Sequence, residues 1–292
     1  MPRRNAIGQA GARLFSINSL DDPVSKHLPE APFSQRRVLV TGASAGIGAA
    51  IARTFARGGA HLELGARRLD RLQDLAEELR LEHDVEVNCR RVDVRHREEV
   101  ESWVDDLARL GRIPDILVNN AGLSRDLLPI HQGHPEGWDE MIDTNVKGLL
   151  YMSRAVLRHM VARDSGHVIH IGSTAGDTVY PGGNVYNATK FAVKALTEGM
   201  NLDLVGTRIR VSSVDPGLVE TEFSQVRFRG DEERARKVYQ GYTPLSAEDV
   251  AEVVRYVASA PPHVNLVRTV VYPTDQRNPY VLHRRTEEQD QG

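Results

Sequence analysis

Short apolar runs alternate with helical patterns along this chain, and this alternation restricts the possible folds more than any other feature. It begins near Arg36 and continues almost to the end of the sequence. Such a succession predicts βαβ units, and therefore a parallel sheet. The runs with the length and composition of buried strands are residues 37–41, 61–66, 85–92, 116–119, 167–172, 210–214 and 269–272.

Between the strand candidates, leucines and other large apolar residues recur at helical spacing, which indicates helices packed on the sheet. Right-handed crossovers would put these helices on both faces and leave a ligand crevice beyond the carboxyl ends of the strands. We therefore expect an α/β, single-domain Rossmann fold with a doubly wound, seven-stranded parallel sheet. The clearest helical stripes are Leu69, Leu72, Leu75 and Leu79, then Val100, Trp103, Val104 and Leu107.

The size and charge of the chain favour a small-molecule partner. It has 292 residues, 40% of them hydrophobic and 26% charged, with a formal net charge of -3. This near balance predicts no broad attraction to nucleic acid or to an anionic membrane. No apolar run approaches the roughly 20 residues that cross a bilayer. The single cysteine, Cys89, fits a reducing compartment, so we expect a cytoplasmic protein without a metal ion.

We divide the chain into a flexible N-terminal extension (residues 1–35), a catalytic domain (residues 36–275) and a C-terminal tail (residues 276–292). The first twenty residues contain Arg3, Arg4 and Arg13 and no acidic residue. This composition is compatible with an organelle transit peptide, with a disordered arm, or with a segment that contacts another subunit. The tail permits either an ordered docking segment or a disordered end.

A glycine-rich turn follows the first strand candidate and opens a helix. Its sequence, TGASAGIG, occupies residues 41–48. Glycines permit a tight turn and a close approach of the backbone to a pyrophosphate, and the N–H groups of the helix amino terminus attract the anion. The turn therefore predicts a dinucleotide site, to which we assign Gly42, Ser44, Gly46, Ile47 and Gly48.

The second strand candidate is followed by Arg67 and Arg68 rather than by an acidic residue. An acidic residue there would accept hydrogen bonds from the ribose of NAD. Two guanidinium groups would instead bind a 2′-phosphate, with Ser44 as a neutral donor, so we predict NADP. The alternative is that both arginines only begin an exposed helix.

Polar residues and glycines also end the third and fourth strand candidates. Asp93 is placed to accept a hydrogen bond from the adenine amino group, while Asn119, Ala121 and Gly122 would lie beside the cofactor. Each of these segments could also be only a turn former.

Several further motifs resemble those of the short-chain dehydrogenase/reductase family in order and spacing. The resemblance covers about residues 36–275 and implies hydride transfer between a nicotinamide and an alcohol or carbonyl carbon. The motifs that carry it are residues 41–48, residues 119–122, Asn145, Ser173, the run from Tyr186 to Lys190, and the pair Pro216 and Gly217.

Tyr186 and Lys190 are four residues apart, so they would project from one face of a helix. To act as acid and base, a tyrosine with a pKa near 10 must move about 3 units toward neutrality, or roughly 4 kcal/mol. We expect the lysine charge and the oxidised nicotinamide to supply this shift. The resemblance implies that Tyr186 exchanges the substrate proton and that Lys190 hydrogen-bonds the nicotinamide ribose.

The resemblance also implies roles for the other motif residues. Ser173 would position the substrate oxygen, and Asn145 would help to hold a water molecule that relays protons. Pro216 and Gly217 would turn the chain near the nicotinamide amide. The family implies a homotetramer or dimer, assembled partly through the helix that contains Tyr186.

The residues around positions 172–176, 182–186, 216–224 and 226–230 resemble the NADP-dependent 3-hydroxy acid dehydrogenases. This subgroup oxidises serine, allo-threonine, 3-hydroxypropionate or 3-hydroxyisobutyrate, or reduces the corresponding semialdehydes. Such an acid needs a cation for its carboxylate, and Arg227 or Arg229 would provide it on a segment that closes as a lid. A solvent-exposed arginine is the alternative for each.

Residues 123–126 depart from the subgroup's pattern and leave the substrate open. Arg125, within them, is either a second anion contact, which would favour a sulfonate or a larger acid, or a solvent-exposed residue. One alternative function is therefore a reductase of the same family that acts on a larger ketone, an aldehyde or a sulfoaldehyde. An alternative of another class is a non-catalytic NADP-binding sensor.

Overall fold

The computed structural model describes residues 31–285, and seven parallel strands form its central sheet in the order β3-β2-β1-β4-β5-β6-β7. The central strands β1 and β4 are mostly apolar, and all neighbouring strands pair in parallel. The predicted doubly wound sheet is confirmed. The strands are β1 (Arg37–Thr41), β2 (His61–Ala66), β3 (Val87–Arg91), β4 (Ile116–Asn119), β5 (Gly166–Ile171), β6 (Ile209–Pro216) and β7 (Arg268–Val271).

The predicted bounds hold for β1, β2 and β4, whereas the other strands differ at their ends. β3 begins two residues after its predicted start, and β6 continues two residues beyond its predicted end at Val214. It continues because Asp215 and Pro216 pair with Val270 and Val271 of β7. Proline has no N–H to donate, so it is suited to the last position of a strand.

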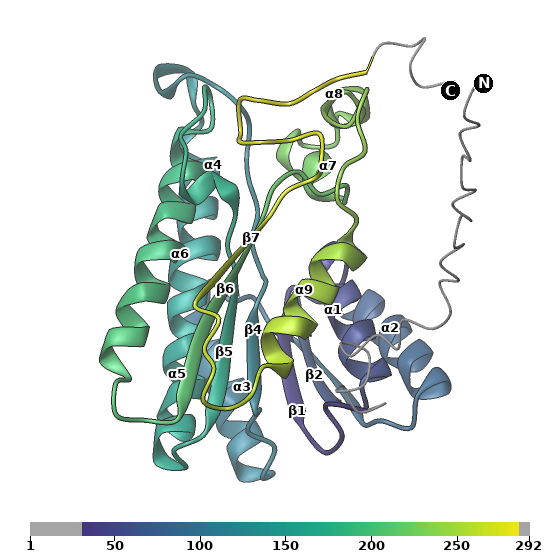
Figure 1. Cartoon of the computed structure of the whole chain (residues 1–292), viewed down its shortest axis with the longest axis vertical. Helices are drawn as coiled ribbons and strands as arrows, with labels where there is room; N and C mark the ends of the chain where they lie inside the picture. The colour runs from purple at the N-terminus through teal and green to yellow at the C-terminus, as the bar shows by residue number, and fades with distance from the viewer. Residues whose placement is uncertain (1–30, 286–292) are drawn as a thin grey trace, which may run out of the picture. The chain divides into compact units, whose positions relative to one another are not determined.

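Long helices cover both faces of the sheet, as Figure 1 shows. One face carries α1 (Gly46–Arg57), α2 (Leu69–Glu82) and α9 (Ala247–Ser259), and the other carries α3 (Arg97–Arg109), α5 (Leu149–Ala162) and α6 (Asn184–Asp203). Three shorter helices lie at the carboxyl end of the sheet: α4 (Pro135–Ile142), α7 (Phe223–Arg227) and α8 (Glu232–Val238).

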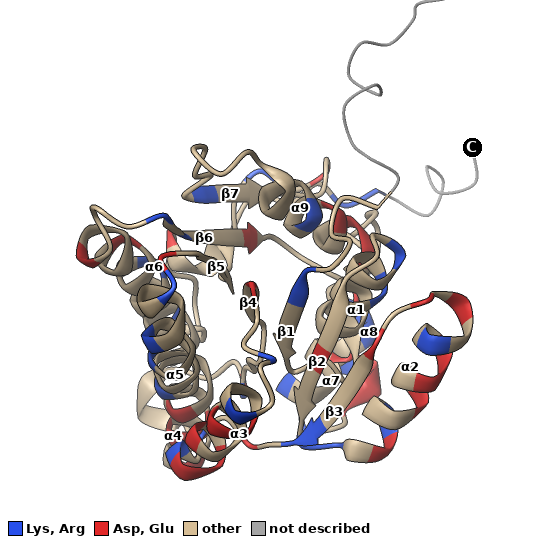
Figure 2. Ribbon diagram, turned by 90° about the horizontal axis from the view of Figure 1, so that it is seen from below, with Lys and Arg blue, Asp and Glu red and all other residues tan. Residues whose placement is uncertain are grey.

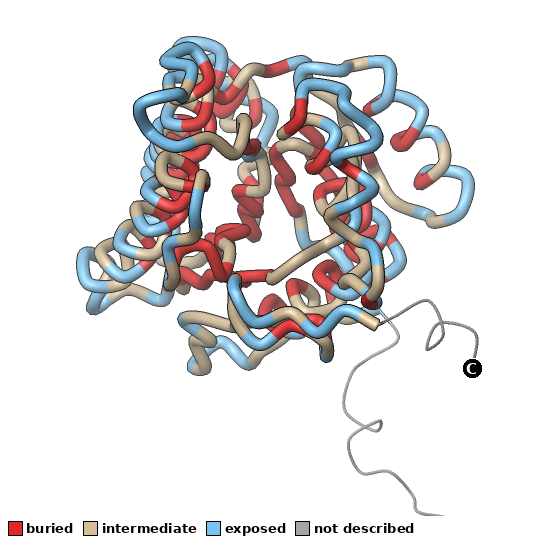
Figure 3. Tube along the Cα trace, turned by 90° about the horizontal axis from the view of Figure 1, so that it is seen from above, coloured by how far each residue is buried: buried red, intermediate tan, exposed pale blue. Residues whose placement is uncertain are grey.

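The apolar core forms one layer on each side of the sheet. The predicted stripes lie in these layers: Leu72, Leu75 and Leu79 of α2 are buried, and so is Trp103 of α3. Figure 3 shows the buried residues along the sheet and the inward faces of the helices, whereas Figure 2 shows charges of both signs on the surrounding helices. No helix between residues 31 and 285 is long and apolar enough to cross a membrane.

The described structure continues on both sides of the predicted domain boundaries. At the amino-terminal side, Phe33 is buried, and its ring lies edge-on to Phe55 at a centroid distance of 4.7 Å. At the carboxyl-terminal side, Gln276 is buried, and its Oε1 accepts a hydrogen bond from Leu218 N at 2.9 Å. The expectations for residues 1–30, including the transit peptide, and for residues 286–292 lie outside the described residues.

Candidate active site

The glycine-rich turn joins β1 to α1 in a conformation that requires glycine. Gly42 and Gly46 have φ angles of 66° and 53°, in the left-handed region. Ala45 at the N-cap gives α1 no side-chain cap. The backbone N–H groups of the first helical turn are therefore available to an anion.

Asn120, at the end of β4, holds this turn in place. Its Nδ2 donates to the carbonyl oxygens of Thr41 and Gly42 at 2.9 and 3.2 Å. Thr41 Oγ1 in turn accepts from the backbone N–H groups of Asn120 and Ala121 at 3.0 and 3.1 Å. A Cβ atom at Gly48 would come within 2.4 Å of Asn120 Nδ2, so Gly48 permits this close packing.

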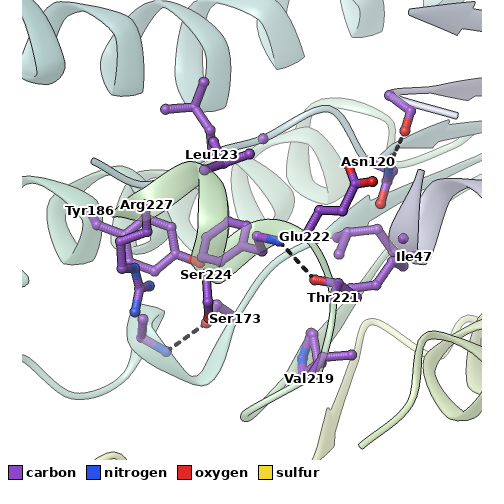
Figure 4. Close-up of a pocket in the computed structure, with 18 of the residues that line it drawn as sticks. Ile47, Asn120, Leu123, Ser173, Tyr186, Val219, Thr221, Glu222, Ser224 and Arg227 are labelled. Atoms are coloured by element: carbon purple, nitrogen blue, oxygen red, sulfur yellow. Dashed lines mark hydrogen bonds between the residues drawn. The ribbon is translucent and has the colours of Figure 1, made fainter. Parts of the chain in front are cut away.

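A cavity of about 610 Å³ lies between the glycine-rich turn and the ends of β5 and β6 (Figure 4). Some of the predicted site residues do not line it: these are Gly48, Asn119, Asn145, Arg125 and Arg229. The predicted residues that do line it are Gly42, Ser44, Gly46, Ile47, Arg67, Arg68, Asp93, Ala121, Gly122, Ser173, Tyr186, Lys190, Pro216, Gly217 and Arg227.

The arginines after β2 border one end of the cavity. Arg68 Nε donates to Ser44 Oγ at 3.3 Å, and Arg68 Nη1 donates to Glu222 Oε2 at 3.0 Å. Arg71 Nη1 donates to the other oxygen of Glu222 at 2.7 Å. This hydrogen bond from Arg71 lowers the pKa of Glu222, so the carboxylate is ionised at neutral pH. Arg67 Nη1 lies 3.7 Å from Glu140 Oε1.

Sequence analysis missed Arg71 and Glu222. The spacing of Arg71, one helical turn after Arg68 on α2, is a signal that could have found it. Glu222 reaches the arginines from the segment after β6, a contact between residues about 150 positions apart. No local pattern predicts a contact of that kind.

Asp93 and Asn119 make contacts other than those predicted for them. Asp93 Oδ1 accepts from Arg95 Nε at 2.9 Å. Burial raises the pKa of Asp93, but the hydrogen bonds from Arg95 outweigh this effect and lower it. Asn119 is buried, and its Nδ2 donates to Ser153 Oγ at 2.9 Å, away from the cavity lining. The cofactor contacts of both residues stay predictions.

The structure brings Ser173, Tyr186 and Lys190 together at the other end of the cavity (Figure 4). Tyr186 and Lys190 both come from α6, and each is only 8% exposed. Lys190 Nζ donates to Ile171 O at 2.9 Å and lies 5.9 Å from the centroid of the Tyr186 ring. Ser173 Oγ, just after β5, accepts from Ala175 N at 3.1 Å.

Asn145 lies outside the cavity lining, in a π-helical turn, Asp143–Gly148. Its Oδ1 accepts from Leu123 N at 2.9 Å, and its Nδ2 donates to Leu123 O at 2.8 Å and to Thr189 Oγ1 at 3.0 Å. A Cβ atom at Gly122 would lie 3.3 Å from Asn145 Oδ1. Asn145 therefore fixes the chain after β4 against α6, and its role toward a water molecule stays a prediction.

Burial favours the uncharged forms of both Tyr186 and Lys190. It lowers the pKa of Lys190 to about 8, although the Asp215 carboxylate opposes this change. It raises the pKa of Tyr186, while the Arg227 guanidinium and a hydrogen bond with Ser173 act to lower it. Arg227 and Ser173 are thus the protein groups that favour a lower pKa of Tyr186, and the expected effect of the lysine charge and the oxidised nicotinamide stays a prediction.

Arg227, at the end of α7, lies beside the tyrosine (Figure 4). Its guanidinium carbon is 5.4 Å from the ring centroid of Tyr186 and 5.1 Å from that of Phe223. Burial raises the pKa of Tyr180 to about 12, although the charge of Arg227 and a hydrogen bond with it act to lower this pKa. Arg227 Nε is buried and has no hydrogen-bond partner within residues 31–285.

The other two candidate arginines are engaged outside the cavity. Arg125 pairs with Glu140 at 2.7 Å and donates to Val226 O at 2.6 Å. It therefore supports the segment that carries Arg227. Arg229 pairs with Asp126 at 3.2 Å, and its side chain is half exposed.

The C-terminal tail contributes cavity residues that the sequence did not predict. Gln276 Oε1 fixes Leu218 N just after β6, and a Cβ atom at Gly217 would lie 2.4 Å from it. Three more tail residues line the cavity: Pro279, Leu282 and Arg284. The part of the tail up to residue 285 is therefore ordered against the site.

These features fit a phosphorylated dinucleotide. The uncapped amino terminus of α1 and the turn at Gly42 suit a pyrophosphate, and the donors of Ser44 and Arg68 suit a further phosphate. A buried tyrosine, lysine and serine at the far end suit proton transfer to an oxygen atom.

Comparisons with known proteins agree with this arrangement. The family model for short chain dehydrogenases matches residues 36–232. An NADP-dependent 3-hydroxy acid dehydrogenase of Salmonella typhi is 48% identical over 240 residues, which are 82% of this chain and 95% of that protein. Sulfoacetaldehyde reductase 2 of Chromohalobacter salexigens is 44% identical, with 82% and 94% covered. The closed form of a serine dehydrogenase complexed with NADP+ matches with a TM-score of 0.79 and 45% identity, over 86% of this chain and 100% of that chain.

The burial of Lys190 predicts a specific pH dependence of stability. Between about pH 8 and its ordinary value of 10.5, Lys190 is neutral in the folded state and charged in the unfolded state. The unfolded state then binds the extra proton, so the free energy of unfolding rises with pH across this window. Below about pH 8 Lys190 is charged in both states, so burial of its charge destabilises the folded state to the full extent. This destabilisation is about 3 kcal/mol.

We therefore expect the free energy of unfolding of the wild type, relative to that of Lys190→Met, to rise between pH 7 and pH 10. Urea denaturation at several pH values would measure it. Lys194→Met is the matched control, because Lys194 lies one turn further along α6 and is ion-paired with Asp177 at 2.9 Å. Parallel stability curves for the wild type and Lys190→Met would contradict the expectation.

Proposed function

This chain belongs to the short-chain dehydrogenase family, and we propose that it interconverts a small 3-hydroxy acid and its carbonyl form. It is an oxidoreductase that acts on CH–OH groups, and NADP is its cofactor. The proposed substrates are of the serine, allo-threonine and 3-hydroxypropionate type. The proposal rests on Arg227. Its Nε is buried and has no hydrogen-bond partner within residues 31–285, and its guanidinium lies beside the Tyr186 ring.

The residues for the cofactor follow from the geometry of the cavity. The turn around Gly42 and Gly46 would hold the pyrophosphate against the amino terminus of α1. Ser44 and Arg68, together with Arg67, would bind the 2′-phosphate. Pro216 and Gly217, which line the far end of the cavity, would lie near the nicotinamide.

The nicotinamide, when bound, supplies or accepts the hydride. Tyr186 would give or take the proton of the substrate oxygen as general acid and base. Lys190 would hold the nicotinamide ribose and keep a positive charge near the tyrosine, since its pKa of about 8 leaves it mostly protonated at pH 7. Ser173 would orient the substrate oxygen, and Asn145 would support a proton-relaying water molecule.

Arg227 would bind the substrate carboxylate. An arginine and a carboxylate form charge-assisted, often bidentate hydrogen bonds, and these are stronger where water is excluded. The guanidinium carbon of Arg227 lies 5.4 Å from the Tyr186 ring centroid, which supports a carboxylate site next to the proposed acid and base. We infer from this proximity a short acid of the 3-hydroxy type.

Reduction of a sulfoaldehyde is the second candidate. A sulfonate would use Arg227 as a carboxylate does, and one relative at 44% identity is named a sulfoacetaldehyde reductase. Arg125, the residue whose presence suggested a sulfonate, pairs with Glu140 instead of lining the cavity. A larger ketone substrate, a cytoplasmic location and a homotetramer or dimer assembled partly through α6 stay predictions from the sequence, whereas the relatives do not support the alternative of a non-catalytic sensor.

Oxidation assays would test the proposal directly. NADPH formation from NADP is measured with 3-hydroxy acids, hydroxysulfonates and neutral alcohols, with Tyr186→Phe as the inactive control. We expect the highest kcat/KM with a 3-hydroxy acid. Preference for a hydroxysulfonate would support the second candidate instead, and absence of turnover with every 3-hydroxy acid would contradict the proposal.

The role of Arg227 predicts a selective defect in Arg227→Ala. We expect its KM for a 3-hydroxy acid to rise on the order of 100-fold, as the loss of a buried charged hydrogen bond of about 3 kcal/mol implies. Its KM for a neutral alcohol should change far less. Because the guanidinium lowers the pKa of Tyr186, the apparent pKa of the kcat/KM profile should rise. Arg229→Ala is the matched control, since Arg229 is exposed and pairs with Asp126; equal KM effects on acids and alcohols would rule out the carboxylate contact.

A further inference from the structure

Glu222, in the segment after β6, contacts two arginines that follow β2. Its two carboxylate oxygens separately accept hydrogen bonds from Arg68 and Arg71, at 3.0 and 2.7 Å. Glu222 also lines the cavity, as Figure 4 shows. The ion pairs therefore join two walls of the cofactor cleft.

The position of Glu222 is one that an anionic group of the cofactor would use. Arg68 Nε is bonded to Ser44 Oγ in the glycine-rich turn, so the same guanidinium faces both the turn and Glu222. Carboxylate and phosphate oxygens accept from a guanidinium with similar geometry. The Glu222 carboxylate thus occupies guanidinium donors that a phosphate group could also use.

We infer that Glu222 competes with the 2′-phosphate of NADP for Arg68 and Arg71, so that binding of the phosphate releases the segment that carries Arg227. This inference rests on the proposed NADP site. It makes Glu222 a determinant of cofactor affinity that does not itself bind the cofactor. Because coupling is reciprocal, a tighter hold of Glu222 on the arginines weakens phosphate binding to the same extent.

The magnitude follows from the exposure of the pair. The side chains of Arg68, Arg71 and Glu222 are 43%, 45% and 41% exposed. Exposed ion pairs contribute at most about 1 kcal/mol, which corresponds to about a 5-fold change in a dissociation constant. Salt screens such pairs, so the effect should shrink as ionic strength rises.

The first test measures binding of 2′,5′-ADP and 5′-ADP to the full-length chain by calorimetry. For Glu222→Gln we expect 2′,5′-ADP to bind about 3- to 5-fold more tightly than to the wild type, with 5′-ADP changed little. Glu220→Gln is the matched control, because Glu220 is exposed on the same segment and no ion pair joins it to an arginine within residues 31–285. Its effect should stay below about 2-fold.

The outcomes separate the inference from the proposed function. If the wild type binds 2′,5′-ADP no better than 5′-ADP, the NADP site itself is wrong. If it prefers 2′,5′-ADP, but Glu222→Gln binds that ligand equally or more weakly, only the competition by Glu222 is overturned.

The second test measures amide hydrogen exchange in residues 221–227. In the wild type, 2′,5′-ADP should speed exchange in this segment relative to 5′-ADP, because the phosphate removes its ion pairs. In Glu222→Gln the segment should exchange quickly before any ligand is added. Slower exchange in the wild type with 2′,5′-ADP would overturn the inference, because it would mean that the phosphate tightens the contact.

Discussion

The site depends on the hydrogen bonds by which Asn120 joins the ends of β4 and β1. Its side chain donates to the carbonyl groups of Thr41 and Gly42, while the Thr41 hydroxyl accepts from the backbone N–H groups of Asn120 and Ala121. These neighbouring strands end at the same edge of the sheet. The hydrogen bonds therefore fix the glycine-rich turn and the chain after β4 together, and the shape of the cofactor cleft follows from them.

The second constraint is the short helix α7, which reaches both ends of the cavity. Glu222 precedes it and contacts Arg68 and Arg71, whereas Arg227 ends it and lies over Tyr186. Arg125, held by Glu140, supports α7 from outside through the Val226 carbonyl. A change at Arg68 or Arg71 and a change at Arg227 thus act on the same few residues, which is why we propose a connection between cofactor binding and the position of Arg227.

The sequence predicted the features that local rules determine. Strand and helix periodicity gave the order of the elements, and the spacing of Tyr186 and Lys190 placed both on one face of α6. Long-range contacts were not predictable in this way. The pairing of Glu222 with Arg71, the engagement of Arg125 with Glu140 and the approach of Gln276 to Gly217 each join distant segments. The pKa of Tyr186 depends on burial by the whole fold, which no local pattern in the sequence describes.

The central claim is that hydride moves between NADP and the third carbon of a 3-hydroxy acid. Isotope transfer tests it most directly: the chain is incubated with NADP and 3-hydroxypropionate that carries two deuterium atoms on its third carbon, and the NADPH is analysed by mass spectrometry. Our account predicts one deuterium in each NADPH formed. NADPH without deuterium, or no NADPH under conditions in which a neutral alcohol is oxidised, would contradict it.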